Sequence, residues 1–259
     1  MEKGMIGWCE FSVEVSGQPL TCLLAEPKEL SDCPALLLNF AADRMASLKS
    51  EPYNITPSMF LAAGHRAASF NLPCHGDREI PGQPRGIAGF CAEWRRGVDV
   101  FAEFVDEGRA VIDALIERRL PEPGRIFVSG TSRGGYCALR LMAADVRIGA
   151  GAAFSPVTDW RVLREFEEFK DAPEVAALAL THFAGALAGR AVWTASGNCD
   201  ARVGTDSCLR FAEAVLRAES EKGCSSSRFV LHVVPEKDHQ LSPHWRQCGG
   251  NYLLDWANK

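Results

Sequence analysis

The stretch RIFVSGTSRGGYCALRLMAA, residues 125–144, joins an apolar run to a helical pattern through a short glycine-rich turn. Its first letters are typical of a strand buried on both faces, and residues 134–144 have helical spacing. Ser132 stands at the tip of the turn, between Gly130 and Gly134, which gives the pattern G-x-S-x-G. A sharp strand-to-helix turn strains its central residue and needs small neighbours, which the two glycines supply. The stretch therefore predicts a nucleophilic serine held above the carboxyl end of a sheet.

Other functions of such a turn are less well matched. A glycine-rich turn at a helix N-terminus can bind a phosphate, but a P-loop needs Gly-Lys-Ser/Thr, which does not occur here. A dinucleotide fingerprint needs G-x-G-x-x-G, and GAGAAF, residues 149–154, fails at the last position. The five letters of G-x-S-x-G are weak alone. Their position directly between a strand and a helix favours the nucleophile over a simple turn.

Around this stretch the chain alternates between strand and helix patterns. CEFSVEV and LTCLLAE, separated by the turn SGQP, indicate an antiparallel hairpin near the N-terminus. The further predicted strands are 34–41, 66–73, 125–129, 147–155, 190–197 and 228–234. The predicted helices are a short one ending at Gly64 and others over 98–115, 134–144, 206–223 and 242–256. This order predicts an α/β fold with a mostly parallel sheet flanked by helices on both faces.

The length of 259 residues suits one α/β domain spanning residues 1–259. Residues 156–189 interrupt the alternation, are too long for a simple connection and have a helical pattern. We interpret them as a small helical cap inserted over one edge of the sheet. Trp160, Phe166 and Phe169 in this segment either line an acyl or alcohol pocket or simply pack the cap.

A serine hydroxyl needs a base to take its proton, and the chain has six histidines. His239 lies in the loop PEKDHQLSP, just after the last predicted strand, and so at the carboxyl edge of the sheet. His75, in PCHGDR, lies in a loop near the same edge and is the strongest alternative. The position and the chain order favour His239 as the base.

The base needs an acid that fixes its tautomer, and three aspartates compete for this role. Asp200 follows the strand that precedes the His239 strand, so Ser132, Asp200 and His239 occur in nucleophile–acid–base order. Asp206 occupies an expected helix N-cap, and Asp238 is the sequence neighbour of the base. Asp200 is therefore the predicted acid.

These motifs give the chain a family resemblance. SGTSRGG, GNCDARV, PEKDHQLSP and FNLPCHGDR resemble the α/β-hydrolase superfamily, most closely the single-domain serine esterases of the dienelactone hydrolase and prolyl oligopeptidase group, over roughly residues 10–257. The backbone N–H of Arg133 is expected to bind an oxyanion. The His-Gly that such enzymes often have after the third strand is replaced by NFAAD, which leaves the N–H of Phe40 or Ala41 as the expected second donor.

The resemblance implies a carboxylesterase that forms an acyl-enzyme on a small-molecule ester. The alternatives are a thioesterase, a small peptidase or a catalytically silent binding protein of the same fold. Dienelactone hydrolases use a cysteine nucleophile, whereas the elbow position here is Ser132. No cofactor is expected, and no metal is expected because the sequence has no H-E-x-x-H or paired-cysteine motif.

Composition bounds the partners and the compartment. A formal net charge of −5 gives no basic surface, so nucleic acid is not an expected partner. No apolar run is long enough for a membrane span or a signal peptide. Ten scattered cysteines without a C-x-x-C pair fit free thiols in the cytoplasm, although an exported chain trimmed of its signal would look the same. The sequence does not predict an oligomeric state.

Overall fold

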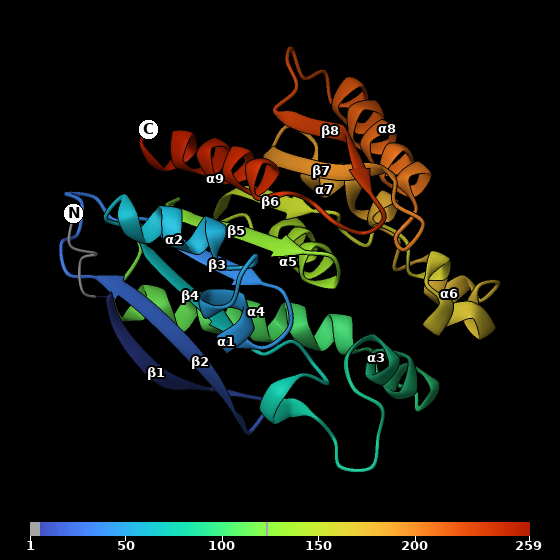
Figure 1. Ribbon diagram of the computed structural model, residues 1–259, viewed down its shortest axis with the longest axis horizontal. Helices are drawn as coiled ribbons and strands as arrows, with labels where there is room; N and C mark the ends of the chain where they lie inside the picture. The colour runs from blue at the N-terminus through green and yellow to red at the C-terminus, as the bar shows by residue number, and fades with distance from the viewer. Residues whose placement is uncertain (1–5, 123) are drawn as a thin grey trace.

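The computed structural model describes residues 6–122 and 124–259, whose strands form an eight-stranded sheet (Figure 1). The strand order is β1-β2-β4-β3-β5-β6-β7-β8. The strands are β1 (Ile6–Val15), β2 (Gln18–Pro27), β3 (Leu36–Phe40), β4 (Arg66–Phe70), β5 (Ile126–Thr131), β6 (Ile148–Phe154), β7 (Ala191–Cys199) and β8 (Phe229–Lys237). The pairs β1–β2 and β2–β4 are antiparallel, and β4 to β8 are joined by parallel pairs through β3, β5, β6 and β7. This is the α/β-hydrolase fold expected from the sequence.

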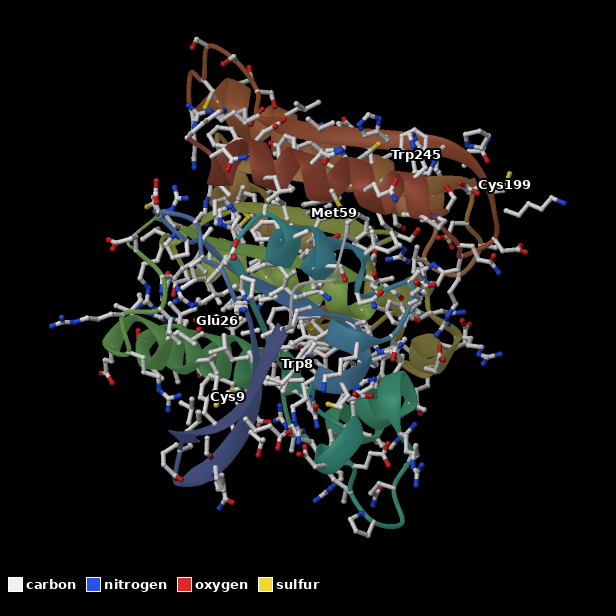
Figure 2. The ribbon with its side chains drawn as sticks, turned by 60° about the vertical axis from the view of Figure 1, so that its left-hand side comes forward. Trp8, Cys9, Glu26, Met59, Cys199 and Trp245 are labelled. Atoms are coloured by element: carbon white, nitrogen blue, oxygen red, sulfur yellow. The ribbon has the colours of Figure 1, made fainter. Side chains whose placement is uncertain are left out.

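The hydrophobic patterns explain where these strands lie. β3 and β4 are buried along their whole length. The apolar run of residues 34–41 predicts this for β3, as a strand covered on both faces. In β1, by contrast, most residues are exposed, and Trp8 and Cys9 lie on the outer strand of the hairpin (Figure 2). The predicted hairpin is therefore present, and its first strand forms an open edge of the sheet.

Two groups of helices cover the two faces of the sheet. The helices other than those of residues 156–189 are α1 (Arg44–Lys49), α2 (Ile55–Ala62), the short η1 (Gly76–Arg78), α3 (Gly86–Arg95), α4 (Val100–Glu117), α5 (Arg133–Ala144), α8 (Thr205–Glu221) and α9 (Pro243–Ala257). Phe60 of α2 and Leu253 of α9 pack in one cluster with Phe127 of β5, whereas α4, α5 and α8 belong to the cluster on the opposite face. Figure 2 shows Met59 of α2 beside α9, where the absence of a side chain at Gly250 leaves it room.

Helix α3 begins inside a glycine- and proline-rich segment, GDREIPGQPRGIAG (residues 76–89), whose composition is typical of a loop. Gly86 has a φ of +62°, which lets the chain turn into the helix. Phe90 in this helix is fully buried, and its ring centroid lies 5.4 Å from that of Phe101 in α4. Packing of this face against the core therefore overrides the loop-like composition.

Residues 156–189, between β6 and β7, form only short helices rather than a long one. They are η2 (Trp160–Val162), η3 (Arg164–Phe169), α6 (Pro173–Ala176), η4 (Leu180–Phe183) and α7 (Ala184–Leu187). In Figure 1, α6 lies on the side of the molecule toward which β5 points, next to α3. The segment is anchored to the core: the Tyr136 hydroxyl in α5 donates to the Leu178 carbonyl over 2.8 Å.

None of the helices in the described part of the chain has the length and apolar character needed to cross a membrane.

Candidate active site

The turn between β5 and α5 places Ser132 in a strained conformation. Its φ of 57° and ψ of −120° are values that a residue with a side chain rarely adopts. A Cβ at Gly130 would overlap the Gly134 carbonyl, and a Cβ at Gly134 would overlap the Phe40 carbonyl of β3. Both glycines are thus required for α5 to start directly beneath the sheet edge. The turn has the geometry expected of a nucleophile elbow.

Asp200 and His239 are brought together from two different loops. Asp200 Oδ2 lies 2.8 Å from Nδ1 of His239, and the aspartate side chain is fully buried while the imidazole is 26% exposed. The other carboxylate oxygen, Oδ1, accepts the backbone N–H groups of Arg202 and Val203 over 3.0 and 3.1 Å. The carboxylate is therefore fixed by two backbone donors and can hold the ring with its proton on Nδ1.

The loop that carries Asp200 is closed by a threonine. The Thr205 hydroxyl donates to the Gly197 carbonyl over 2.6 Å and accepts the backbone N–H of Asp200 over 3.2 Å. These bonds tie the end of β7 to the start of α8. They set the aspartate at the carboxyl edge of the sheet, beside the loop that follows β8.

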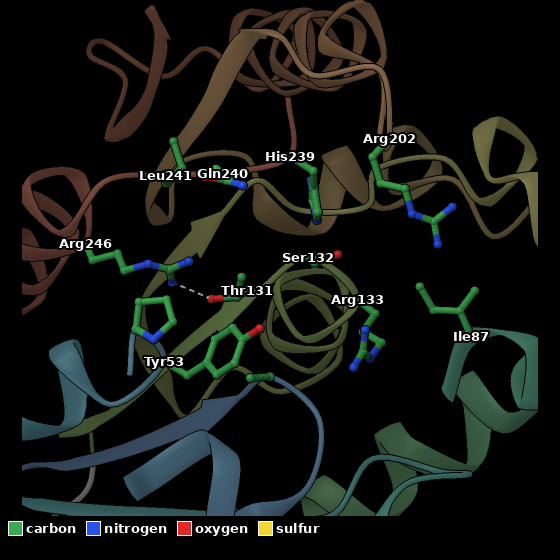
Figure 3. A pocket seen from close by; sticks show the side chains of 12 residues that line it. Tyr53, Ile87, Thr131, Ser132, Arg133, Arg202, His239, Gln240, Leu241 and Arg246 are labelled. Atoms are coloured by element: carbon green, nitrogen blue, oxygen red, sulfur yellow. Dashed lines mark hydrogen bonds between the residues drawn. The ribbon is translucent and has the colours of Figure 1, made fainter. Parts of the chain in front are cut away.

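Ser132 and His239 line the same cavity. Figure 3 shows the His239 ring directed toward Ser132. Among the described residues, Ser132 Oγ makes no hydrogen bond to this ring. Such bonds are often long in enzymes without substrate and shorten when it binds. With Nδ1 on Asp200, the remaining ring nitrogen is the one available to take a proton from Ser132.

The three residues predicted to offer an N–H group to an oxyanion differ in what that group does. Arg133 is the first residue of α5, so its backbone N–H has no acceptor within the helix. The N–H of Ala41 already donates to Ser47 Oγ over 3.0 Å, which corrects the expectation that it is free to bind an oxyanion. Phe40 lies within β3, opposite Gly130 of β5, and its role as a donor stays a prediction.

The cavity at Ser132 has a volume of about 430 Å³. It is lined by Ala41, Pro52, Tyr53, Ile87, Thr131, Ser132, Arg133, Arg202, His239, Gln240, Leu241 and Arg246 (Figure 3). The walls come from the loops after β3, β5, β7 and β8, together with α3 and α9. A cavity at the carboxyl ends of the strands is where open α/β sheets bind their ligands.

His75, the alternative base, is not part of this cavity lining. Its Nδ1 lies 2.7 Å from the Pro73 carbonyl, and its Nε2 is buried without a hydrogen-bond partner. Burial, with a smaller contribution from the Arg133 charge, lowers the pKa of His75 to about 4. The ring has no carboxylate partner among the described residues, so it lacks the support that Asp200 gives His239.

The rival acids lie away from the imidazole. Asp206 is exposed in the first turn of α8 and pairs with Arg210 over 2.6 Å. The N-cap of α8 is Gly204, so the expectation that Asp206 caps this helix is wrong. Asp238 is exposed, with a φ of 51°, and makes no side-chain hydrogen bond among the described residues.

The three aromatic residues considered for the pocket lie elsewhere. Trp160 and Phe166 are fully buried, and the Trp160 ring centroid lies 4.5 Å from that of Phe101 and 5.0 Å from that of Tyr136. Phe169 lines a separate hollow that also includes Trp94. Within the described chain, no residue of 156–189 lines the Ser132 cavity. Of the two alternatives, packing therefore describes these rings: Trp160 and Phe166 bury apolar area in the core, and the partly buried Phe169 packs against it.

Sequence reasoning missed several cavity residues. Tyr53 comes from the loop before α2 and Ile87 from α3, and neither stands in a recognisable motif. Arg202 belongs to the quoted stretch GNCDARV, which is the one available signal for it. Arg246 is buried on α9, and its hydrogen bond of 2.7 Å to Thr131 Oγ1 spans 115 positions in the chain.

Comparison with known proteins identifies a family for this chain. A model described as "Alpha/beta hydrolase family" matches residues 46–256. No curated protein sequence matches the chain.

Solved structures are similar to the chain over nearly its whole length. TT1662 from Thermus thermophilus is 21% identical, with a TM-score of 0.69 over 98% of this chain and 99% of the other. A cold-adapted esterase from an Arctic intertidal metagenomic library is 19% identical, with a TM-score of 0.70 over 98% and 97%. Dipeptidyl peptidase 4 from Porphyromonas gingivalis is 15% identical, with a TM-score of 0.66, over 97% of this chain but 35% of that one. At these identities the similarity shows the fold.

Proposed function

The chain belongs to the alpha/beta hydrolase family and is a hydrolase of that fold, and we propose that it cleaves carboxylic esters through an acyl-enzyme on Ser132. One observation carries the proposal. The strained Ser132 and His239, whose ring is paired with the buried Asp200, line one cavity at the carboxyl edge of the sheet although they lie far apart in the sequence. A hydroxyl, an imidazole and a buried carboxylate in this order form the machinery of a serine hydrolase.

In the first half of the reaction, Ser132 Oγ attacks the ester carbonyl while His239 takes its proton. Asp200 stabilises the imidazolium that results, and the Arg133 N–H binds the developing oxyanion. His239 then gives the proton to the alkoxide oxygen, so the alcohol leaves as the C–O bond breaks. The acyl group remains on Ser132.

In the second half, a water molecule gives its proton to His239 and attacks the acyl-enzyme. Collapse of this second tetrahedral intermediate releases the carboxylic acid, and Ser132 regains its proton from His239. Every proton in this scheme passes through one imidazole.

Covalent labelling tests the proposal. A fluorophosphonate should add one phosphonyl group to the wild-type protein, and peptide mapping should place the group on Ser132. Ser132→Ala should not be labelled, and its turnover of p-nitrophenyl esters should fall by about 10⁶ when circular dichroism shows that it is folded. Labelling of the alanine variant, or near-wild-type turnover by it, would overturn the assignment.

The leaving group is tested separately. p-Nitrophenyl esters of graded acyl length should be hydrolysed faster than matched thioesters and peptide p-nitroanilides. Preference for an anilide would favour a peptidase, and a protein that is labelled by no phosphonate and turns over no substrate would be a binding protein.

A further inference from the structure

The cavity beside Ser132 is cationic although the chain as a whole is acidic. The formal net charge of the chain is −5, yet the described residues that line the cavity include three arginines and no aspartate or glutamate. The arginines are Arg133, Arg202 and Arg246. A wall of one sign in an oppositely charged protein selects ligands of the other sign.

One of these charges is already neutralised. Both terminal nitrogens of Arg202 donate to the Glu165 carboxylate, over 2.7 and 2.8 Å. This two-point ion pair satisfies the guanidinium and leaves it little charge to offer a ligand. The positive character of the cavity therefore rests on the other two arginines.

Arg246 is buried and has no anionic partner within residues 6–122 and 124–259. It is 6% exposed, its Nη1 donates to Thr131 Oγ1 over 2.7 Å, and its Nε has no acceptor in the same part of the chain. The rings of Tyr53 and Phe154 lie 5.7 and 5.4 Å from its guanidinium carbon. Their cation–π attraction offsets part of the hydration that the guanidinium loses on burial. Desolvation lowers its pKa to about 10, so the group stays positively charged at neutral pH.

Arg133 is the second cation without a carboxylate. Its Nε is buried without an acceptor, and it forms no ion pair among the described residues. Figure 3 shows Arg133 and Arg246 on opposite sides of Ser132. A single bound anion would therefore meet one guanidinium rather than two, which suits the single charge of a carboxylate better than that of a phosphate.

We propose that the natural substrate is an ester whose acyl part carries a carboxylate, and that Arg246 binds this carboxylate. Burying a cation without a partner is costly, and a substrate anion would supply the missing partner. Thr131 directly precedes Ser132, so the Arg246 guanidinium that is bonded to Thr131 lies close to the nucleophile. A carboxylate bound to this guanidinium must therefore be joined to the reacting carbonyl by a short acyl chain. The leaving alcohol must lie against His239, which donates its proton, so the anion belongs to the acyl part. This inference deepens the proposed function and rests on it.

A pair of methyl esters with the same number of acyl carbons tests the proposal. Monomethyl succinate and methyl butyrate differ by a carboxylate in place of a methyl group, and acid release from both can be followed by pH-stat titration. The wild-type protein should have a kcat/KM at least tenfold higher for monomethyl succinate. Arg246→Gln should lower the ratio of the two values by about tenfold or more, since a charge-assisted bond of this kind contributes that much. The control Arg217→Gln, on the exposed face of α8, should keep the wild-type ratio.

Two results would overturn the proposal. Equal or better hydrolysis of methyl butyrate by the wild type would show that the enzyme does not select a carboxylate in the acyl part. Loss of the preference in Arg133→Gln, with the ratio unchanged in Arg246→Gln, would show that Arg133, on the other side of Ser132, binds the substrate carboxylate.

Binding to Ser132→Ala separates this inference from the proposed function and does not depend on the folding of Arg246→Gln. Calorimetric titration should detect monomethyl succinate but neither methyl butyrate nor inorganic phosphate. Binding of monomethyl succinate with no hydrolysis by the wild type would support the anion site and reject the esterase. Binding of inorganic phosphate without binding of monomethyl succinate would overturn the proposal that the site takes a carboxylate.

Discussion

The loops that follow β4 and β8 each present a histidine at the carboxyl edge of the sheet, in opposite environments. In the β8 loop, His239 is partly exposed and its Nδ1 faces the Asp200 carboxylate. In the β4 loop, His75 is buried, and its Nδ1 faces the Pro73 carbonyl instead. A carbonyl orients a ring as well as a carboxylate does, but it cannot balance the charge that the ring gains as a base. A place at the carboxyl edge of the sheet is therefore not enough to make a histidine a base.

Replacing each of the two histidines separately by alanine should give the largest difference in turnover. His239→Ala should lower kcat for p-nitrophenyl esters by about 10⁶, because the nucleophile loses its base. His75→Ala should retain turnover within about tenfold, measured per folded molecule. If His75→Ala is inactive and His239→Ala is active, the roles of the two loops are reversed.

Asp200→Asn tests whether the carboxylate is what distinguishes the loops. The variant should fold, since an amide oxygen can still accept from Arg202 and Val203, but kcat should fall by about 10⁴ because the ring adopts the wrong tautomer. Asp206→Asn is the matched control on exposed α8 and should stay within about tenfold of the wild type. Full activity of Asp200→Asn would mean that another group orients the base.

Trp160→Ala tests the packing behind the β4 loop, where the Phe90 ring lies against both Trp160 and His75. Removing this fully buried ring should lower the free energy of unfolding by about 3–5 kcal/mol, measured by urea denaturation. The ratio of kcat/KM values across ester chain lengths should not change. A shift in chain-length preference at unchanged stability would restore Trp160 to the pocket.

The low pKa of His75, about 4 against an ordinary 6.5, predicts a smaller effect on stability. Between these values the unfolded chain binds the proton that the folded protein refuses, so stability should fall as the pH decreases from 6.5 to 4. This residue contributes up to about 3 kcal/mol to the free energy of unfolding, because a pKa shift of one unit corresponds to about 1.4 kcal/mol. His75→Phe should flatten the pH dependence in urea titrations. A variant with the wild-type slope would show that the ring titrates normally.

The comparison also shows what the sequence could and could not predict. The elbow and the Asp200 and His239 loops follow local patterns, because each lies directly after a strand of recognisable composition. The parallel order of the sheet then brings them to one edge. The fold, including the hairpin and the burial of the central strands, was predictable for the same reason.

Features that depend on contacts between distant segments were not predictable. Arg246 reaches Thr131 because α9 packs on the face of the sheet that α2 also covers, and nothing in its own helix indicates this. The N–H of Ala41 is occupied because a side chain six residues later folds back onto it. Trp160 and Phe166 have the composition of a pocket wall, yet core packing, which the segment alone does not specify, determines their position.

The position of the site in the sheet also has a consequence for synthesis of the chain. The elbow on β5 is the first of the three parts to leave the ribosome, while the acid follows β7 and the base follows β8 at the far edge. Domains form largely as translation proceeds from the N-terminus. A nascent chain that ends before residue 239 thus has a serine but no activated nucleophile. Under the proposed roles, hydrolytic activity begins only when the last strand has joined the sheet, and an incompletely translated chain does not hydrolyse esters.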